Sequence, residues 1–191
     1  MQKIISFIKR KILRIDKNRW DYQYAKGNWE GLKSEEELQR IYIAKNLIVK
    51  YNLKGNILEI GCGEGIFFNL IPIDSYSFYE GIDISEVAIG KAPQAPNAKF
   101  AAADMETFIP EHAPFSYIVM NEVLYYSKTP LQLVKKYNKY LAKDGVFLIG
   151  MFIGKHSEKI WDGIDKNYAV LETVTVNQVS KVWLYKILKP L

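Results

Sequence analysis

The sequence has one cysteine and two histidines among its 191 residues, and this scarcity excludes several classes of protein. A single cysteine, Cys62, excludes a disulfide within the chain and fits a cytoplasmic setting, where thiols stay reduced. The cysteine and the histidines do not form a cluster with the spacing of metal ligands, so we expect no metal site. Hydrophobic residues make up 49% of the chain and charged residues 25%, as is typical of a soluble globular domain.

The chain also lacks an apolar run long enough to span a bilayer. Charges interrupt every apolar run near the N-terminus, which excludes a secretory signal peptide. The net charge is +5, and much of the excess lies before residue 20. There the sequence predicts a basic amphipathic helix over residues 1–15, which either packs on the domain, contacts a membrane surface or binds nucleic acid. We favour packing or a loose membrane contact over nucleic acid.

The most informative segment is Ile57–Gly65, an apolar run followed by three glycines at alternate positions. The run indicates a buried strand, and the glycines after it let the backbone turn sharply and approach a ligand. Two phosphate-binding motifs are absent, because the dinucleotide fingerprint needs a glycine where Ile66 stands and a P-loop needs Gly-Lys-Ser/Thr. The turn therefore fits a nucleoside ligand without phosphate, such as S-adenosylmethionine.

Polar residues recur where three further strands are expected to end. Asp83, Asp104 and Asn121 each follow a short apolar run, at intervals of about 20 residues that suit strand–helix units. Ligands of doubly wound sheets bind at the carboxyl ends of the strands. A carboxylate at Asp83 can accept hydrogen bonds from both hydroxyls of a ribose. The sequence thus predicts an α/β fold with a nucleoside pocket at this edge of the sheet.

With these residues in this order, residues 55–152 resemble the class I S-adenosylmethionine-dependent methyltransferases. The resemblance implies a doubly wound, Rossmann-like sheet of seven strands with an antiparallel C-terminal strand pair. It implies that the glycine turn passes under the methionine and ribose, that Asp83 binds the ribose, and that Asp104 and Met105 hold the adenine. Glu59 and the backbone at Asn121 would face the ammonium group. The residues expected to contact the cofactor are Glu59, Gly61, Cys62, Gly63, Gly65, Asp83, Ile84, Asp104, Met105 and Asn121.

A finer resemblance rests on the aromatic segment Trp20–Trp29 and the string Asn121–Tyr126. Both are similar to small methyltransferases of polysaccharide clusters and to nodulation N-methyltransferases that act on chito-oligosaccharides. This resemblance implies methyl transfer to an oxygen or nitrogen of a saccharide or another small molecule, in polysaccharide biosynthesis.

Methyl transfer depends mainly on alignment of the acceptor, and an alcohol acceptor usually needs a general base. Glu122 and Tyr125 follow the fourth strand and His156 follows the fifth, so these candidate catalytic residues belong to the active face. His156 is the better base of the two histidines, because His112 precedes the fourth strand and belongs to the opposite side. A surface residue at a helix N-terminus is the slightly favoured alternative for His156. Of Tyr125 and Tyr126, we expect one to be buried and one to line the pocket.

Residues 1–33 are expected to form the basic helix and an aromatic cover, and residues 34–191 the cofactor-binding domain. Within that domain the sequence predicts helices over residues 35–51, 66–70, 86–90, 131–141 and 156–165. A turn over residues 143–145 precedes the fifth strand at 146–152, and strands over 169–176 and 182–188 form the antiparallel pair.

Three alternative functions stay open. A lipid or quinone methyltransferase would suit the amphipathic N-terminus. RNA methylation is disfavoured, because Asn121 is followed by Glu-Val-Leu rather than Pro-Pro-aromatic and Cys62 is in the wrong place for C5 methylation. A protein that binds the cofactor without turnover is disfavoured by the intact set of ligand residues.

Overall fold

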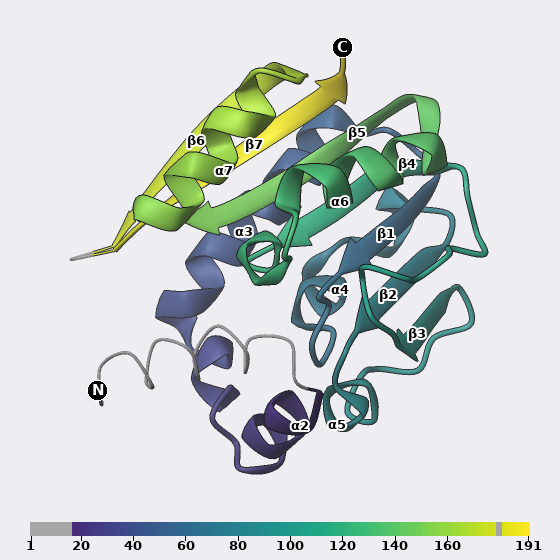
Figure 1. The fold of residues 1–191 in the computed structure, drawn as a ribbon. Coiled ribbons are helices and arrows are strands. Elements are labelled where there is room, and N and C mark those ends of the chain that lie inside the picture. Colours follow the sequence, from purple (N-terminus) through teal and green to yellow (C-terminus); the bar gives the residue numbers. More distant parts are fainter. Residues whose placement is uncertain (1–16, 179–180) are drawn as a thin grey trace.

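The computed structural model describes residues 17–178 and 181–191, so the predicted basic helix over residues 1–15 lies outside the described residues. The described chain forms a seven-stranded sheet in the order β3-β2-β1-β4-β5-β7-β6 (Figure 1). Strands β1 to β5 run parallel, and β7 is antiparallel to both of its neighbours, β5 and β6. The predicted doubly wound sheet with an antiparallel C-terminal pair is confirmed.

The elements follow the strand–helix alternation that the sequence predicts. The strands are β1 (Asn56–Ile60), β2 (Tyr79–Asp83), β3 (Ala98–Ala102), β4 (Phe115–Asn121), β5 (Leu141–Phe152), β6 (Tyr168–Gln178) and β7 (Lys181–Pro190). The helices are α2 (Lys17–Ala25), α3 (Glu35–Tyr51), α4 (Ile66–Leu70), α5 (Glu86–Ile89), α6 (Pro130–Tyr137) and α7 (Lys155–Asp165). None of the helices within the described ranges has the length and apolar character needed to cross a bilayer.

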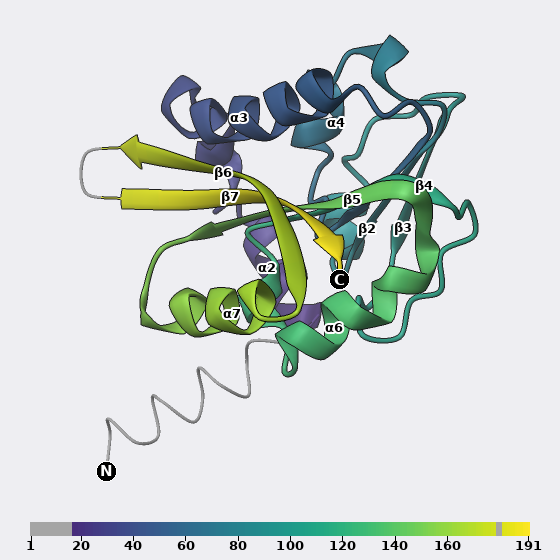
Figure 2. The same ribbon diagram turned by 90° about the horizontal axis from the view of Figure 1, so that it is seen from above.

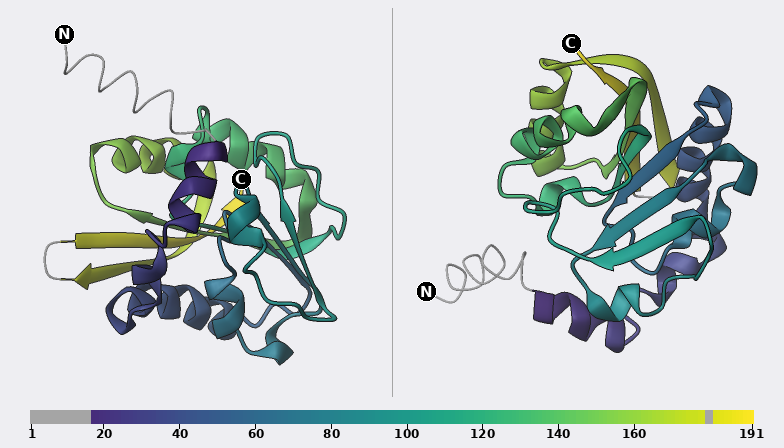
Figure 3. Two further views of the ribbon diagram at one scale, coloured as in Figure 1. Left: turned by 90° about the horizontal axis from the view of Figure 1, so that it is seen from below. Right: turned by 90° about the vertical axis from the view of Figure 1, so that its right-hand side faces the viewer.

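Helices cover both faces of the sheet (Figure 2). One hydrophobic cluster joins α3 and α4 to one face, and a second joins α6 and α7 to the other. Helix α2 packs beside α5 at the β3 side of the molecule (Figure 3). Strands β1 and β4 are buried at nearly every position, as central parallel strands covered on both faces should be.

Helix α3 has the predicted bounds, and local sequence accounts for them. Ser34 is the N-cap, and its hydroxyl accepts a hydrogen bond from the N–H of Glu37. The helix ends at Asn52, which adopts the left-handed conformation common at helix C-termini. Its buried residues recur at helical spacing and are Arg40, Ile41, Ala44, Leu47 and Ile48.

Two predicted boundaries are wrong. The helix expected over residues 131–141 ends at Tyr137 and continues as the 3-10 turn Asn138–Tyr140. The turn expected over residues 143–145 is instead a bulge inside β5, because the register with β4 shifts between Phe115 and Tyr117. Gly145 is needed there, since a Cβ atom at this position would lie 2.5 Å from the Phe115 carbonyl oxygen.

Candidate functional site

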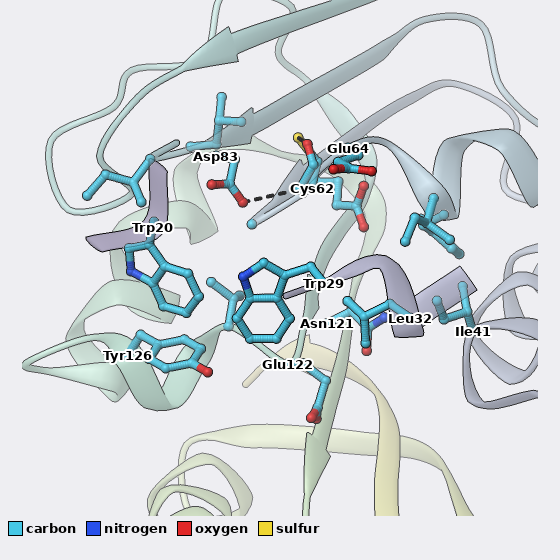
Figure 4. Close-up of a pocket in the computed structure, with 18 of the residues that line it drawn as sticks. Trp20, Trp29, Leu32, Ile41, Cys62, Glu64, Asp83, Asn121, Glu122 and Tyr126 are labelled. Carbon is cyan, nitrogen blue, oxygen red and sulfur yellow. Dashed lines mark hydrogen bonds between the residues drawn. The ribbon is translucent and has the colours of Figure 1, made fainter. Parts of the chain in front are cut away.

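A cavity of about 530 Å³ lies at the carboxyl ends of β1, β2 and β4 (Figure 4). It is lined by the glycine turn after β1 and by residues that follow β2, β3 and β4. Segment Lys17–Lys33, which we call the cover, adds Trp20, Tyr24, Trp29 and Leu32 to the lining. Ligands of doubly wound sheets bind at this edge.

The glycine turn brings bare backbone to the cavity. Gly61 and Gly63 line it with φ angles of 78° and 54°, which side chains adopt only with strain. A Cβ atom at Gly61 would also lie 2.6 Å from the Val123 side chain, and one at Gly63 would lie 2.8 Å from the Tyr24 hydroxyl. Gly65 does not line the cavity, and a Cβ atom there would meet Pro93 at 2.7 Å. Two of the three predicted glycines therefore reach the cavity, and the third serves packing.

Asp83 ends β2 beside this turn. Its carboxylate accepts hydrogen bonds from the N–H of Gly63 at 3.0 Å and from the N–H of Ser85 at 2.9 Å. Burial raises its pKa, and backbone hydrogen bonds from Ser85, Gly63 and Ile84 oppose that rise. A carboxylate offers about four acceptor sites, so Asp83 keeps capacity for a diol. Ser85, rather than Asp83, caps α5.

Glu59 is buried in β1 and also lines the cavity. The hydroxyl of Tyr79 donates a hydrogen bond to it. Burial raises the pKa of Glu59 to about 8, and the charge of Asp83 adds to the rise, while the Tyr79 hydrogen bond opposes it. A cationic neighbour would stabilise the charged form of this buried carboxyl group.

The remaining predicted cofactor residues except Gly65 reach the same cavity. Ile84, Asp104 and Met105 line it after β2 and β3, and Asn121 lines it at the end of β4. Cys62 lines it too, but the thiol is buried and its pKa is raised. Because a thiol must ionise to attack, this setting places Cys62 in the cavity wall and does not suit it as a nucleophile.

Glu122 occupies a strained position directly after β4. It is one of two residues other than glycine with positive φ in the part of the chain that the structure describes, at 58°. One carboxylate oxygen accepts from the Tyr125 hydroxyl at 2.9 Å, and the other from the N–H of Phe152 at 2.6 Å. Burial raises its pKa, and the charge of Arg40 opposes the rise. Strain of this kind persists only where the surrounding structure holds the residue in place.

The structure separates the other candidate catalytic residues. Tyr125 lines the cavity beside Glu122, and burial raises its pKa. Tyr126 lines it as well, and both rings are half-buried, so the expectation of one buried and one lining ring is wrong. His156 is exposed in the first turn of α7 and does not line the cavity. His112 stacks on Phe78 next to the opposite, amino end of β4, as expected.

The cover supplies an aromatic cluster that the sequence indicated only by its density of rings. The Trp20 ring stacks on Trp29 with centroids 5.5 Å apart and meets the Tyr126 ring edge-on at 5.0 Å. Figure 4 shows these three rings together at the cavity. The sequence did not reveal that Lys17–Ala25 is helical, because its nine residues include only one that is buried, Tyr24.

Sequence reasoning also missed a charged group on the α3 side of the cavity. Arg40 is buried, lines the cavity and pairs through Nε with Glu37 at 3.0 Å. Its guanidinium lies 5.8 Å from the ring of Trp183 on β7, and Lys181 pairs with the same Glu37. Arginine recognises carboxylates well, so Arg40 could hold the carboxylate of the methionine moiety.

The cavity is acidic, which fits a cationic cofactor. Its described lining residues include two cations, Arg40 and Lys181, and six carboxyl groups, of which Glu59 has the pKa raised to about 8: Glu37, Glu59, Glu64, Asp83, Asp104 and Glu122. Such a lining repels phosphate groups and attracts a sulfonium and an ammonium. Bare backbone in the glycine turn and free acceptor sites on Asp83 complete the fit to S-adenosylmethionine.

Comparison with known proteins agrees with this geometry. Residues 28–176 match the family model of a methyltransferase domain. No curated protein matches the sequence. The N-methyltransferase NodS from Bradyrhizobium japonicum WM9, solved with S-adenosyl-L-homocysteine, has a similar fold, with 23% identity and a TM-score of 0.74 over 85% of this chain and 92% of that one.

Two further solved structures share the fold at lower identity. Magnesium protoporphyrin IX methyltransferase (ChlM) from Synechocystis PCC 6803, with bound SAM, is 16% identical, with a TM-score of 0.63 over 81% of this chain and 80% of that one. The plantazolicin methyltransferase BpumL, in complex with a pentazolic desmethylPZN analog and SAH, is 14% identical, with a TM-score of 0.71 over all of both chains. The family match covers most of the chain, so this protein belongs to the methyltransferase-domain family and is a class I enzyme that uses S-adenosylmethionine.

Proposed function

We propose that this enzyme transfers a methyl group to a nitrogen or oxygen of a small molecule or saccharide, and that an amine is the preferred acceptor. The single observation that carries the proposal is the placement of Glu122. Its carboxylate lies on the cavity beside the predicted cofactor residues and is held by two donors in a strained backbone.

The cofactor residues have the roles that the resemblance implies. S-adenosylmethionine, when bound, supplies a methyl group on a positively charged sulfur. We assign the ribose to Asp83, the adenine to Asp104 and Met105, and the ammonium to Glu59 and the Asn121 backbone. Gly61 and Gly63 leave room for the ligand, whereas Gly65 leaves room for Pro93, which packs against the turn outside the cavity.

Glu122 accepts the proton that the acceptor loses. Burial raises the pKa of Glu122 toward neutral pH. A pKa near the working pH favours general-base catalysis. An ammonium group loses its proton far more readily than a hydroxyl does, so this base suits an amine. The rings of Trp20, Trp29 and Tyr126 would attract a cationic amine through their faces. Tyr125 orients the carboxylate, and the exposed position of His156 leaves Glu122 as the proposed base.

The first test uses glucosamine oligosaccharides and their N-acetylated counterparts as acceptors, with formation of S-adenosylhomocysteine as the readout. We expect turnover with the free amine and none with the acetylated form. Glu122→Gln should lower kcat about 100-fold or more, with the dissociation constant of S-adenosylmethionine changed less than about twofold. Glu158→Gln, an exposed change on α7, is the matched control.

Four results would contradict parts of the proposal. Full turnover by Glu122→Gln would remove Glu122 as the base. Equal turnover of the acetylated oligosaccharide would point to a hydroxyl acceptor. No turnover of either saccharide, with turnover of a lipid or quinone on vesicles, would favour the alternative of a membrane-surface methyltransferase that uses residues 1–15. Binding without turnover of any acceptor would favour a cofactor-binding protein.

We place the enzyme in the cytoplasm, with residues 1–33 as an N-terminal segment made of the basic helix and the cover, and residues 34–191 as the cofactor-binding domain. The lining residues Trp20 to Leu32 support the first part of that division. Nucleic acid is not a favoured partner, because the acidic cavity would repel a phosphate backbone.

A further inference from the structure

The turn Met105–Phe108 follows Asp104. One lysine, which does not line the cavity, donates hydrogen bonds to three carbonyls of this turn. The ammonium of Lys136, on α6, donates to the backbone carbonyls of Met105 at 3.2 Å, Glu106 at 3.0 Å and Phe108 at 2.8 Å. The hydroxyl of Tyr137, the next residue, donates to the Met105 carbonyl at 2.9 Å. Four hydrogen bonds from α6 therefore converge on one short turn.

The three carbonyls require the charged form of this lysine. An ammonium has three N–H donors, whereas a neutral amine has two. Partial burial lowers the pKa of Lys136, and the carboxylates of Glu106 and Asp104 oppose that change. A guanidinium, which is planar, presents its donors as a fork rather than from one point. Lysine is thus the side chain that suits three converging carbonyls.

The opposite side of this turn faces the cavity. Asp104 and Met105 line it, whereas Lys136 and Tyr137 do not. Asp104 is itself fixed, because one of its carboxylate oxygens accepts from the N–H of Glu106 at 2.8 Å. Any movement of the Met105 and Glu106 backbone would therefore move the Asp104 carboxylate.

The same turn is tied to the loop that carries the acceptor residues. The hydroxyl of Ser127 donates to the Glu106 carboxylate at 2.6 Å. Ser127 directly follows Tyr125 and Tyr126, which line the acceptor side of the cavity. The position of the turn therefore affects both the Asp104–Met105 wall and the loop with Tyr125 and Tyr126.

We propose that Lys136 is a positioning residue whose ammonium fixes the Asp104–Met105 wall, so that the cavity selects a purine with an amino group at C6. The proposal rests on the adenine placement given under Proposed function. Lys136 itself does not touch the ligand and acts through the three carbonyls that it holds.

The test compares two ligands that differ in this group. S-adenosyl-L-homocysteine carries the C6 amino group, and S-inosyl-L-homocysteine carries a carbonyl there. We expect the wild type to bind the adenosyl ligand at least about tenfold more tightly, because a site built to accept a hydrogen bond rejects the analogue without the donor. Lys136→Met should lose most of that ratio, chiefly through weaker binding of S-adenosyl-L-homocysteine.

Lys135→Met is the matched control. Lys135 is the preceding residue on α6, is exposed, and carries the same charge. We expect this variant to keep the wild-type ratio. Both dissociation constants are measured by calorimetry on the same sample, so any loss of folded protein cancels in their ratio.

Chemical rescue separates the ammonium from the rest of the side chain. Lys136→Cys, treated with 2-bromoethylamine, regains an ammonium at the length of lysine. We expect the ratio to be lost in the untreated variant and restored in the treated one. Cys62 is the one cysteine of the wild-type chain and is buried, so treated wild type reports any effect of modification elsewhere.

The outcomes distinguish this proposal from the one on which it rests. Equal binding of the two ligands by the wild type would overturn the adenine placement and the role of Lys136 with it. A wild-type ratio that collapses in Asp104→Asn but persists in Lys136→Met would overturn the role of Lys136 alone. Failure of the alkylated variant to regain the ratio would also count against the ammonium.

Discussion

The two sides of the cavity are held by different forces. On the strand side, the turn after β1 is fixed by backbone hydrogen bonds, with the N–H groups of Gly61 and Cys62 donating to the Ile82 carbonyl at 2.7 and 2.9 Å. The cover is held by ring contacts, such as that of Trp20 with Tyr126, and by charged side chains, such as Asp21, which accepts from the Ser85 hydroxyl at 2.7 Å. Backbone hydrogen bonds of this kind are part of the folded sheet, whereas exposed ion pairs weaken as the salt concentration rises. The strand side should therefore be the constant part of the site and the cover the adjustable part.

The cover has a second anchor on the opposite flank. Glu64, in the glycine turn, pairs with Lys33 at 2.6 Å and with Lys91 at 2.7 Å. Lys91 also donates to the Tyr24 carbonyl at 3.1 Å. One buried carboxylate thus joins the cover to the turn beneath it.

The largest expected effect is on the strand side, at Asp83→Ala. This change removes the proposed ribose ligand and the acceptor of the Gly63 N–H. We expect the affinity for S-adenosylmethionine to fall about 100-fold, since a hydrogen bond to a charged group contributes roughly 1.5–3 kcal/mol. Calorimetry measures the change, and Asp162→Ala on the exposed side of α7 is the control. A fall of less than about threefold would remove Asp83 from the ribose site.

The same division explains what could be predicted from sequence. The strand side is encoded locally, because apolar runs, glycines and acids at intervals of about 20 residues mark each strand end. The cover is encoded at long range, since Asp21 meets Ser85 across 64 positions and neither residue signals the other. Arg40 was missed for a related reason, because a charged residue in an amphipathic helix is ordinarily on its solvated face. The bulge in β5 was missed because Lys143–Gly145 has the composition of a turn.

The second prediction concerns the pH dependence of cofactor binding at Glu59, on the strand side of the cavity. Burial raises the pKa of Glu59 to about 8, so its carboxyl group is largely protonated at pH 6 and must ionise to pair with an ammonium. Binding of S-adenosylmethionine should therefore tighten as pH rises from 6 to 8, by up to about tenfold for each pH unit. Above about pH 8 the ligand's own ammonium loses its proton and the gain ends. Glu59→Gln should flatten this dependence, whereas an equal slope in that variant would assign it to another group.

Glu59 also affects stability in a defined direction. Its folded pKa of about 8 lies above its ordinary value of 4.5, so the protonated form stabilises the fold below pH 4.5. This contribution is lost as pH rises through 8. The Tm of the wild type should consequently fall relative to that of Glu59→Gln between pH 5 and pH 9 in thermal unfolding.

A smaller effect is expected on the cover, at Lys33→Met. This change breaks the pair with Glu64 while leaving every residue that lines the cavity in place. We expect S-adenosylhomocysteine to dissociate about threefold to tenfold faster, followed by stopped-flow fluorescence of the cover tryptophans. Salt should speed dissociation in the wild type and have less effect in the variant.

Lys26→Met is the control for this experiment, because Lys26 is an exposed lysine of the same cover. It should keep both the wild-type rate and its dependence on salt. A wild-type rate that stays constant from low to high salt would show that charges do not hold the cover closed.

The smallest effect is expected at Lys50→Met, on a surface ion pair far from the cover. Lys50 pairs with Glu172 at 2.7 Å, nearly the same distance as the pair of Lys33 with Glu64. Lys50 joins α3 to β6, which the core already holds together, and its side chain is 63% exposed. The free energy of unfolding in urea should fall by less than about 0.5 kcal/mol, and ligand dissociation should not change. The contrary result would be that Lys50→Met speeds ligand dissociation as strongly as Lys33→Met does. The loss of any close ion pair would then explain both effects, and the ion pairs of the cover would have no special role in retaining the ligand.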